Sequence, residues 1–265
     1  MAPLTVLLAP DAPSRYRDAA ATFPRSFRVA DGGSAPPASA RIIRGDAGWT
    51  DRVRGLLEGG SRAVLVGDPV CESVRDLRTH AARVGALIML APPGSHDPGI
   101  SVARTGMDAA GGSLLECRVL AASSFSPSTT MMAALQLIRS VDSPVVTLDI
   151  HSRDRHGLHA TGTLESGRDV VLAIDVCDAV PPLARLRVIS SRGLIEADIP
   201  LTERTRPSTV RDVSAAGESR AASGYLSASR AALMRFHSAI GQPPDLSELN
   251  AFHRDHTLVG GLRWD

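Results

Sequence analysis

The clearest pattern of apolar and polar positions lies in the first third of the chain. Residues 62–66 form a short apolar run rich in β-branched side chains, and the turn residues Gly67-Asp68-Pro69 follow it. From residue 72 to 84 apolar residues recur at steps of three and four with arginines between them, and Gly85 ends the pattern. Residues 86–90 form a second apolar run. The stretch therefore predicts a βαβ unit, whose ligands usually lie beyond the carboxyl ends of its strands.

The remainder of residues 1–99 alternates in the same way. Strands are predicted at 4–9, 27–30 and 41–44, and helices at 15–21 and 49–57. Strands that alternate with helices predict a parallel sheet with helices on both faces. We therefore expect an α/β, Rossmann-like nucleotide-binding domain over residues 1–99.

The pattern changes after residue 99. Apolar runs predict strands at 114–121, 145–152, 158–165, 169–177, 185–190 and 193–199. Turn residues at 165–167 and 190–193 predict hairpins between neighbouring strands. Helices are predicted at 128–140, 225–240 and 246–259, and the polar, Ser- and Arg-rich residues 205–223 are expected to form a mobile loop. Residues 100–265 are thus expected to form an α+β domain with a mainly antiparallel sheet.

The composition is that of a globular protein. With 43% hydrophobic residues, the 265-residue chain can bury a core. It has no run of about 18 apolar residues and no signal-peptide pattern at its start, so we expect a soluble, cytoplasmic protein. Three widely spaced cysteines argue against a disulfide framework or a cysteine-rich zinc site. A net charge of +1 and 3% aromatic residues give no sign of nucleic-acid binding.

The chain contains no lysine, so all 29 of its Lys and Arg residues are arginine. Arginine stays protonated at any accessible pH and serves neither as an ordinary proton donor nor as a Schiff-base nucleophile. A genome that prefers arginine codons accounts for the composition. Any mechanism that needs a lysine is nevertheless excluded.

The turn after the first predicted strand is where a dinucleotide-binding domain carries its glycine-rich loop. Here the turn has no glycine, its two prolines lack amide donors, and Asp11 would repel a phosphate. The candidate cofactor-binding residues of this turn are nevertheless Asp11, Ser14 and Arg15, and Arg15 or Arg17 would offset the lost donors. Asp31 lies where an acid usually binds the ribose, although an acid in a glycine-rich turn also occurs for structural reasons.

Residues 63–93 match a known frame of motifs without a gap. Pro69 fits the proline of a T-P-N-x-x-H motif, Gly85 the glycine of the next strand, and Pro93 the last residue of an E-K-P motif. Residues 164–176 look like an F-x-N-G hairpin, and residues 186–200 look like an L-x-V-x-G-x-x-G-x-L-x-x-D-x-P strand pair. The chain thereby resembles the glucose-fructose oxidoreductase and inositol dehydrogenase (Gfo/Idh/MocA) family over most of its length.

The resemblance implies a two-domain dehydrogenase fold that binds NAD or NADP at the edge of the first sheet. Asp68, Pro69, Ala91 and Pro92 take cofactor-binding positions of the family's motifs. The family's E-K-P glutamate and lysine are replaced here by Ala91 and Pro92, and the first motif's histidine is replaced by Ser73. The segment that supplies the family's D-x-x-x-H pair is missing. The cofactor is therefore NADP or NAD, or it is absent.

The densest cluster of polar residues is the segment 151–159, which reads HSRDRHGLH. Histidines titrate near neutral pH, and a neighbouring carboxylate holds the ring in one tautomer. Arginines bind a substrate carboxylate or phosphate through two parallel hydrogen bonds. The alternative is a solvated hairpin loop, and the spacing fits no standard metal site. The candidate catalytic residues here are His151, Asp154, His156 and His159, and the candidate substrate-binding residues are Arg153 and Arg155.

Three further histidines stand out. His96 follows the Ala-Pro-Pro turn in the region where the family places its lysine, so it is a candidate substitute acid. His253 and His256 lie three residues apart on a predicted helix and share a face, which is more typical of a helix surface than of a site.

Three functions remain open. The first is an oxidoreductase that acts on a small molecule in specialised metabolism and uses a histidine in place of the missing lysine. The second is a cofactor-free cyclase, isomerase or lyase on the same fold. The third is a non-catalytic protein that pairs through its second sheet. A homodimer formed through the C-terminal sheet is expected in the first case as well.

Overall fold

The computed structural model describes residues 4–30, 40–110, 114–202, 207–222 and 226–261. The chain forms two compact units, Met1–Pro92 with Ser229–Asp265, and Pro93–Ala228. The domain boundaries predicted from the sequence differ from this division, because residues 229–265 were assigned to the second domain. These residues belong to the first unit since Ala232, Leu233 and Phe236 complete its hydrophobic core.

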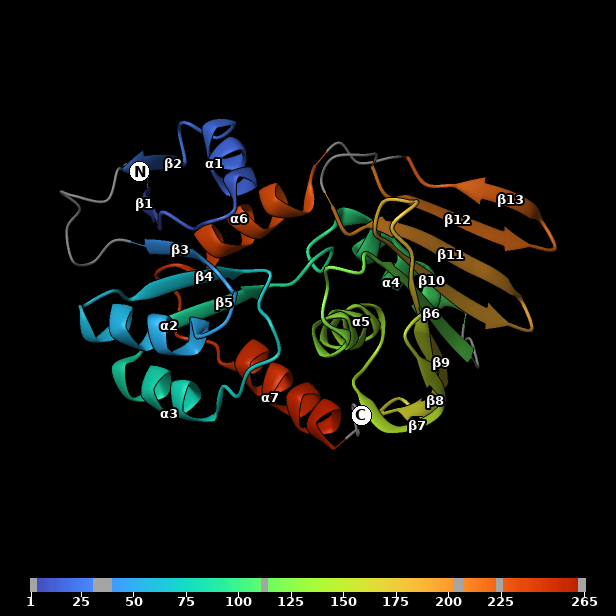
Figure 1. Ribbon diagram of the computed structural model, residues 1–265. Coiled ribbons are helices and arrows are strands. Elements are labelled where there is room, and N and C mark those ends of the chain that lie inside the picture. The colour runs from blue at the N-terminus through green and yellow to red at the C-terminus, as the bar shows by residue number, and fades with distance from the viewer. Residues whose placement is uncertain (1–3, 31–39, 111–113, 203–206, 223–225, 262–265) are drawn as a thin grey trace. The chain divides into compact units, whose positions relative to one another are not determined.

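A parallel sheet of five strands organises the first unit, in the order β2-β1-β3-β4-β5 (Figure 1). The strands are β1 (Leu4–Leu8), β2 (Phe27–Ala30), β3 (Ala40–Arg44), β4 (Ala63–Gly67) and β5 (Leu87–Ala91). Every residue of β4 is buried, as expected for a strand covered on both faces. The predicted α/β, Rossmann-like fold class of this part is confirmed.

Helices cover both faces of this sheet (Figure 1). The two helices on one face are α1 (Ser14–Ala21) and α6 (Ala228–Ala239), whose buried residues share one core with the strands. The three on the other face are α2 (Trp49–Glu58), α3 (Arg75–Val84) and α7 (Ser247–Gly260). Trp49 of α2 and Phe252 of α7 pack edge to face, with their ring centroids 5.9 Å apart.

The predicted βαβ unit is present as β4, α3 and β5, and β4 pairs with β5 in parallel. The helix begins at Arg75 rather than at the predicted residue 72. The preceding residues are held in a loop, because Val70 bonds to Gly45 and the Glu72 carboxylate bonds to the first amides of α2.

An eight-stranded sheet forms the second unit, in the order β13-β12-β11-β10-β6-β9-β8-β7. Its strands are β6 (Leu114–Ala121), β7 (Val145–Asp154), β8 (Gly157–Leu164), β9 (Asp169–Val176), β10 (Leu183–Ser190), β11 (Gly193–Pro200), β12 (Thr209–Ser214) and β13 (Gly217–Arg220). All neighbours are antiparallel except β6 and β9. The predicted strands and both predicted hairpins, β8–β9 and β10–β11, are therefore confirmed.

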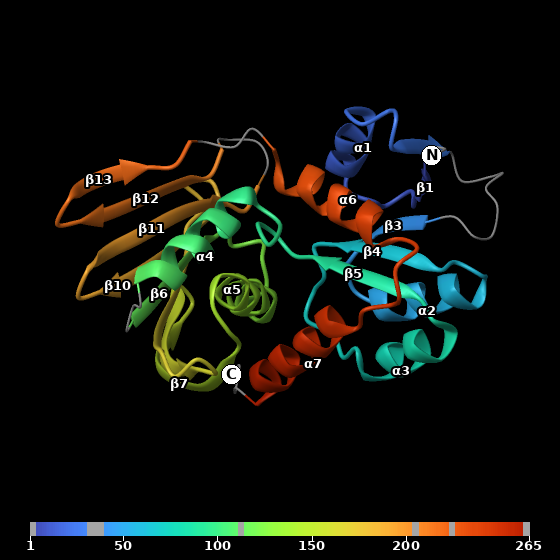
Figure 2. The same cartoon turned by 180° about the vertical axis from the view of Figure 1, so that it is seen from behind.

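Two helices, α4 (Pro98–Ala110) and α5 (Pro127–Val141), cover one face of this sheet (Figure 2). The side chains of α5 are buried almost all round, as its apolar sequence requires. Helix α4 was not predicted from the sequence. None of the helices in the described part of the chain is long and apolar enough to cross a bilayer.

The prediction of a loop over residues 205–223 is wrong for β12 and β13, which extend the sheet. These strands carry few apolar residues, so the hydrophobic pattern does not reveal them. Polar cross-strand contacts hold β12 in place instead, such as the ion pair between Arg211 and Glu196 at 2.9 Å.

Candidate functional site

The strand order places a topological switch point between β1 and β3. The chain leaves β1 for α1 on one face of the sheet and leaves β3 for α2 on the other (Figure 1). Ligands of open α/β sheets bind at such points, outside the carboxyl ends of the strands. The residues that follow β1 and β3 are therefore the first candidates for a binding site.

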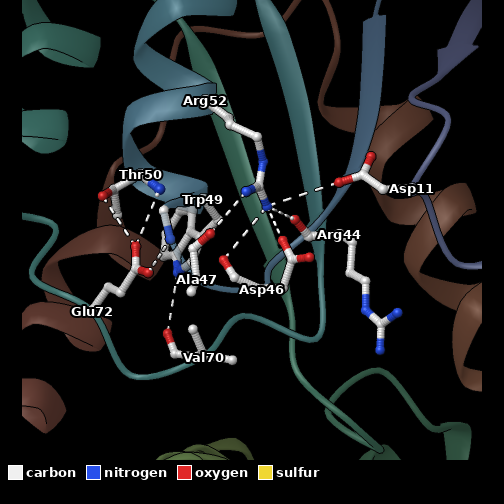
Figure 3. A network of polar contacts seen from close by, with 10 residues as sticks. Asp11, Arg44, Asp46, Ala47, Trp49, Thr50, Arg52, Val70 and Glu72 are labelled. Carbon is white, nitrogen blue, oxygen red and sulfur yellow. Dashed lines mark hydrogen bonds and ion pairs between the residues drawn. The ribbon is translucent and has the colours of Figure 1, made fainter.

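Arg52 of α2 occupies the centre of this region (Figure 3). Its guanidinium donates to the carbonyl oxygens of Arg44 and Ala47, both at 2.9 Å, and forms an ion pair with Asp46. The Asp11 carboxylate, in the turn after β1, lies 3.9 Å from the same guanidinium. Arg52 thus links the turn after β1 to the loop after β3. The Arg44 side chain points away from this network (Figure 3).

The N-terminus of α2 is occupied by the chain's own carboxylate. Glu72 accepts hydrogen bonds from the backbone amides of Gly48 and Thr50 and from the Thr50 hydroxyl (Figure 3). The Trp49 indole donates to the Val70 carbonyl at 3.1 Å and fixes the same loop. A carboxylate at a helix N-terminus satisfies the charge that would otherwise attract a phosphate. This helix end is therefore closed to an anionic ligand.

Arg15 and Asp68 form an ion pair at the same edge of the sheet, with 2.5 Å between nitrogen and oxygen. The Arg15 guanidinium also lies 5.1 Å from the centre of the Tyr16 ring. Burial lowers the pKa of Arg15, whereas Asp68 and Tyr16 raise it by more, so its pKa ends above the ordinary value and Arg15 stays charged. Asp68 has φ of 52°, a left-handed conformation that is uncommon outside glycine and that concentrates at functional sites.

The N-terminus of α1 is open, in contrast to that of α2. It begins after Pro13 without a side-chain cap and without an acidic residue in its first turn. Ser14 is exposed and Arg15 is half-buried. The free amides, a hydroxyl and a guanidinium suit the phosphate end of a dinucleotide, although Pro10 and Pro13 contribute no amide. These residues therefore fit the phosphates of a dinucleotide, which side chains would hold in place of a glycine-rich loop.

The remaining predicted cofactor positions lie at the ends of β4 and β5. Pro69, Ala91 and Pro92 are buried, and the Ala91 carbonyl accepts a hydrogen bond of 3.0 Å from the Asp68 amide. Asp31, the predicted ribose-binding acid, lies outside the described residues.

His96, the predicted substitute acid, is half-buried at the start of the second unit. Asp97 beside it is buried and was not singled out from the sequence. Burial raises the pKa of Asp97, while hydrogen bonds from the Ser208 hydroxyl and the Gly99 amide lower it by less. Asp97 directly precedes α4, whose first residue is Pro98. An aspartate before a proline is a helix-start signal that the sequence does contain.

The predicted histidine cluster lies on the β7–β8 hairpin, and its three histidines are exposed. His151 contacts the Thr161 hydroxyl at 2.6 Å, His156 accepts from Arg155 at 3.0 Å, and His159 lies 3.9 Å from Asp175. Asp154 accepts from the backbone amide of His156 rather than from an imidazole. Arg153 is half-buried and Arg155 exposed. Within the described residues, the histidines therefore have separate partners instead of one shared centre.

A parallel five-stranded sheet followed by an eight-stranded sheet with one helical face defines the class of fold. It is the two-domain fold of Gfo/Idh/MocA-type dehydrogenases, as predicted from the sequence motifs. No family model and no curated protein matches the sequence.

Solved structures match the chain along its whole length. One is a UDP-N-acetylglucosamine 3-dehydrogenase from Acidithiobacillus ferrooxidans, with a TM-score of 0.72 and 16% identity over 98% of this chain and 96% of that one. A 3-ketoreductase from Actinomadura kijaniata, solved in complex with NADP, has a TM-score of 0.73 and 16% identity over 98% and 97%. A dehydrogenase from Chromobacterium violaceum has a TM-score of 0.74 and 12% identity over 99% and 94%. At these identities the likeness establishes the fold.

Proposed function

We propose that the chain is an NAD(P)-dependent oxidoreductase that acts on a small molecule. The observation that carries this proposal is the whole-length fold match to a 3-ketoreductase solved with NADP. The open N-terminus of α1 at the switch point supports it, because a dinucleotide of this fold class places its phosphates at a helix N-terminus. The site residues give the direct test of this proposal.

In this proposal Ser14 and Arg15 hold the phosphate end of the cofactor. A bound nicotinamide supplies hydride transfer to or from a substrate carbon. Asp68, fixed by its left-handed backbone and by Arg15, takes a position at the carboxyl end of β4 where it accepts hydrogen bonds from ribose hydroxyls. The negative charge of Asp11 repels a phosphate near the start of the turn, so the phosphate is expected next to Ser14, where α1 begins.

A histidine replaces the missing lysine as the group that moves a proton at the substrate oxygen. His96 is the first candidate, since it is half-buried and follows the end of β5. The exposed His151, His156 and His159 are the alternatives. Arg153 and Arg155 are positioned on the same hairpin to bind a substrate carboxylate or phosphate.

The proposal is tested by titrating the protein with NADPH and NADH and following the protein fluorescence. The expected result is saturable binding of one of the two cofactors. An absence of binding at millimolar cofactor would remove the oxidoreductase from consideration.

A second candidate is a cofactor-free cyclase, isomerase or lyase. The Arg15–Asp68 ion pair favours it, because Asp68 already satisfies the charge of Arg15 that a cofactor phosphate would need. Proline at positions 10 and 13 favours it as well. Single replacement of His96, His151, His156 and His159 by glutamine should then abolish turnover in at least one variant. Full activity in all four would exclude these residues as the proton carriers.

We also propose a homodimer that forms through the face of the eight-stranded sheet opposite α4 and α5. Alternating charges cross this face on neighbouring strands, with Glu116 2.7 Å and Glu196 3.3 Å from Arg187, and Glu196 also 2.9 Å from Arg211. When a second copy is related to the first by a two-fold axis, the acidic side chains of one copy can lie opposite the basic side chains of the other. Light scattering should give twice the chain mass, and a strict monomer at high concentration would count against the dimer.

A further inference from the structure

Four basic side chains face the boundary between α3 and α7. Arg75 and Arg78 lie three residues apart on α3, and His253 and His256 lie three residues apart on α7. Residues at this spacing share one face of a helix. The two helices pack against each other, and the Arg78 guanidinium donates to the Asn250 side-chain oxygen of α7 at 3.3 Å. The four side chains therefore belong to one surface region of the first unit.

The charges that act on His253 are all positive. Burial lowers the pKa of His253 most, and Arg78, His256 and Arg75 lower it further. The carboxylates on the same two helices are Asp76, Glu248 and Asp255, and none of them is among the charges that influence it. The pKa of His253 therefore lies below its ordinary value, in a locally positive environment.

No acidic side chain in the described part of the chain forms an ion pair with any of the four residues. Several other arginines of the described part do have an acidic partner. Arg235 of the neighbouring α6, for example, pairs with Glu248 of α7 at 2.7 Å. Grouping cations without a counter-charge costs free energy through repulsion, and a bound anion would remove that cost.

The imidazole of His253 adds a second, independent observation. Its Nδ1 atom is buried and has no hydrogen-bond partner among the described residues. A buried polar atom without a partner is uncommon and indicates an absent water, ion or ligand, or a functional constraint. With Nδ1 enclosed, Nε2 is the ring nitrogen that remains to donate a hydrogen bond to a ligand.

We propose that Arg75, Arg78, His253 and His256 bind the phosphoryl group of a small molecule. A phosphate dianion has the charge to offset two guanidinium groups, and its oxygens accept the parallel N–H bonds that arginine offers. The two imidazoles add donors from the opposite helix. Asn250 orients Arg78 toward this position through its side-chain oxygen. The site uses none of the residues assigned above to the cofactor or to proton transfer.

The test is an NMR titration of the histidine ring protons with inorganic phosphate at constant ionic strength, with chloride as the matched salt. Phosphate should shift the His253 and His256 signals saturably, and it should raise the pH at which His253 titrates, because a bound anion favours the protonated ring. An equal response to chloride would show general screening and would overturn the proposal.

The phosphate affinity of variants distinguishes a specific binding site from an adventitious ion only. Arg75→Gln removes an exposed side chain, so the fold should be intact, and phosphate affinity should fall at least about tenfold, roughly one guanidinium contact. Arg25→Gln removes an equal charge from an exposed position after α1 and should leave the affinity unchanged. Equal affinity in Arg75→Gln and Arg78→Gln would contradict the assignment.

Discussion

Arg15 has two partners in the structure and a third in the proposed function. It lies over Tyr16 and pairs with Asp68, and it is the second residue of α1. A cofactor phosphate would compete with Asp68 for the same guanidinium. Arginine tolerates such an exchange because it keeps its charge whichever anion it contacts.

Replacing Asp68 with asparagine tests this competition. Asp68→Asn should lower the free energy of unfolding by about 1 kcal/mol, since a half-exposed ion pair is lost. The same change should strengthen binding of pyrophosphate, because Arg15 loses its internal anion. Urea denaturation and calorimetry measure the two effects. Asp18→Asn, on the exposed side of α1, is the control, and unchanged pyrophosphate binding in Asp68→Asn would contradict the competition.

The raised pKa of Asp97 predicts how the stability of the protein changes with pH. Burial raises its pKa, so the folded protein holds this proton more tightly than the unfolded chain does. The stability that Asp97 contributes is therefore present below the ordinary aspartate pKa and is lost as the pH rises through the raised value. Asp97→Asn keeps the acceptor for Gly99 and Ser208 without the charge.

The melting temperature of Asp97→Asn should consequently exceed that of the wild type by more at pH 7 than at pH 4. Differential scanning calorimetry at the two pH values measures the difference. Other titrating groups are common to both proteins and cancel. A difference that does not change with pH would show that Asp97 is not held by burial in the way described.

At the scale of elements, the loops after β3 and β4 depend on one glycine. A Cβ on Gly45 would lie 2.3 Å from the Pro69 Cα and 2.7 Å from its nitrogen. The Gly45 amide and carbonyl also bond to Gly67 and Val70. This close approach of two loops positions Asp46, Arg52 and Glu72 around the switch point.

Gly45→Ala should therefore destabilise the protein by about 1–3 kcal/mol, because the backbone of Pro69 has to move. Gly55→Ala is the matched control, since nothing lies within 4 Å of its Cβ in the exposed part of α2. It should stabilise the helix by about 0.5–1 kcal/mol. Urea denaturation of both variants decides the point, and a Gly45→Ala protein as stable as the wild type would refute the close approach.

The elements that the sequence predicts best are those with a strong period. Residues 62–90 show continuous apolar strands around an amphipathic helix, and the βαβ unit formed as expected. Strands β12 and β13 were missed because few of their residues are apolar and their neighbours place them. Helix α4 was missed although Asp97 and Pro98 mark its start. The packing of α6 and α7 on the first unit depends on contacts far apart in the sequence, such as that between Trp49 and Phe252.

The candidate site shows the same limit. Asp11, Ser14, Arg15 and Asp68 were predictable because strand ends identify the binding edge of a parallel sheet. The role of Glu72 at the N-terminus of α2 and the bonds of Arg52 were not predictable, since each joins residues brought together by folding. The 151–159 segment was predicted from composition, and folding gave its histidines separate exposed partners.

At the scale of the whole molecule, the fold and the local chemistry carry different information. The two-domain dehydrogenase fold spans the entire chain, at 16% identity to its NADP-bound neighbour. The glycine-rich loop and the lysine of the family's motifs are both replaced. The central claim is therefore that a dinucleotide still binds at the N-terminus of α1, held by side chains instead of backbone amides.

Calorimetric titration of NADPH into the wild type and Arg15→Gln tests that claim most directly. The wild type should bind one NADPH per chain, and Arg15→Gln should bind at least about tenfold more weakly, a loss of about 1.4 kcal/mol. Arg25→Gln should bind like the wild type, because its side chain is exposed beyond the end of α1. No heat of binding in the wild type at millimolar NADPH, or equal affinity in Arg15→Gln, would contradict the account.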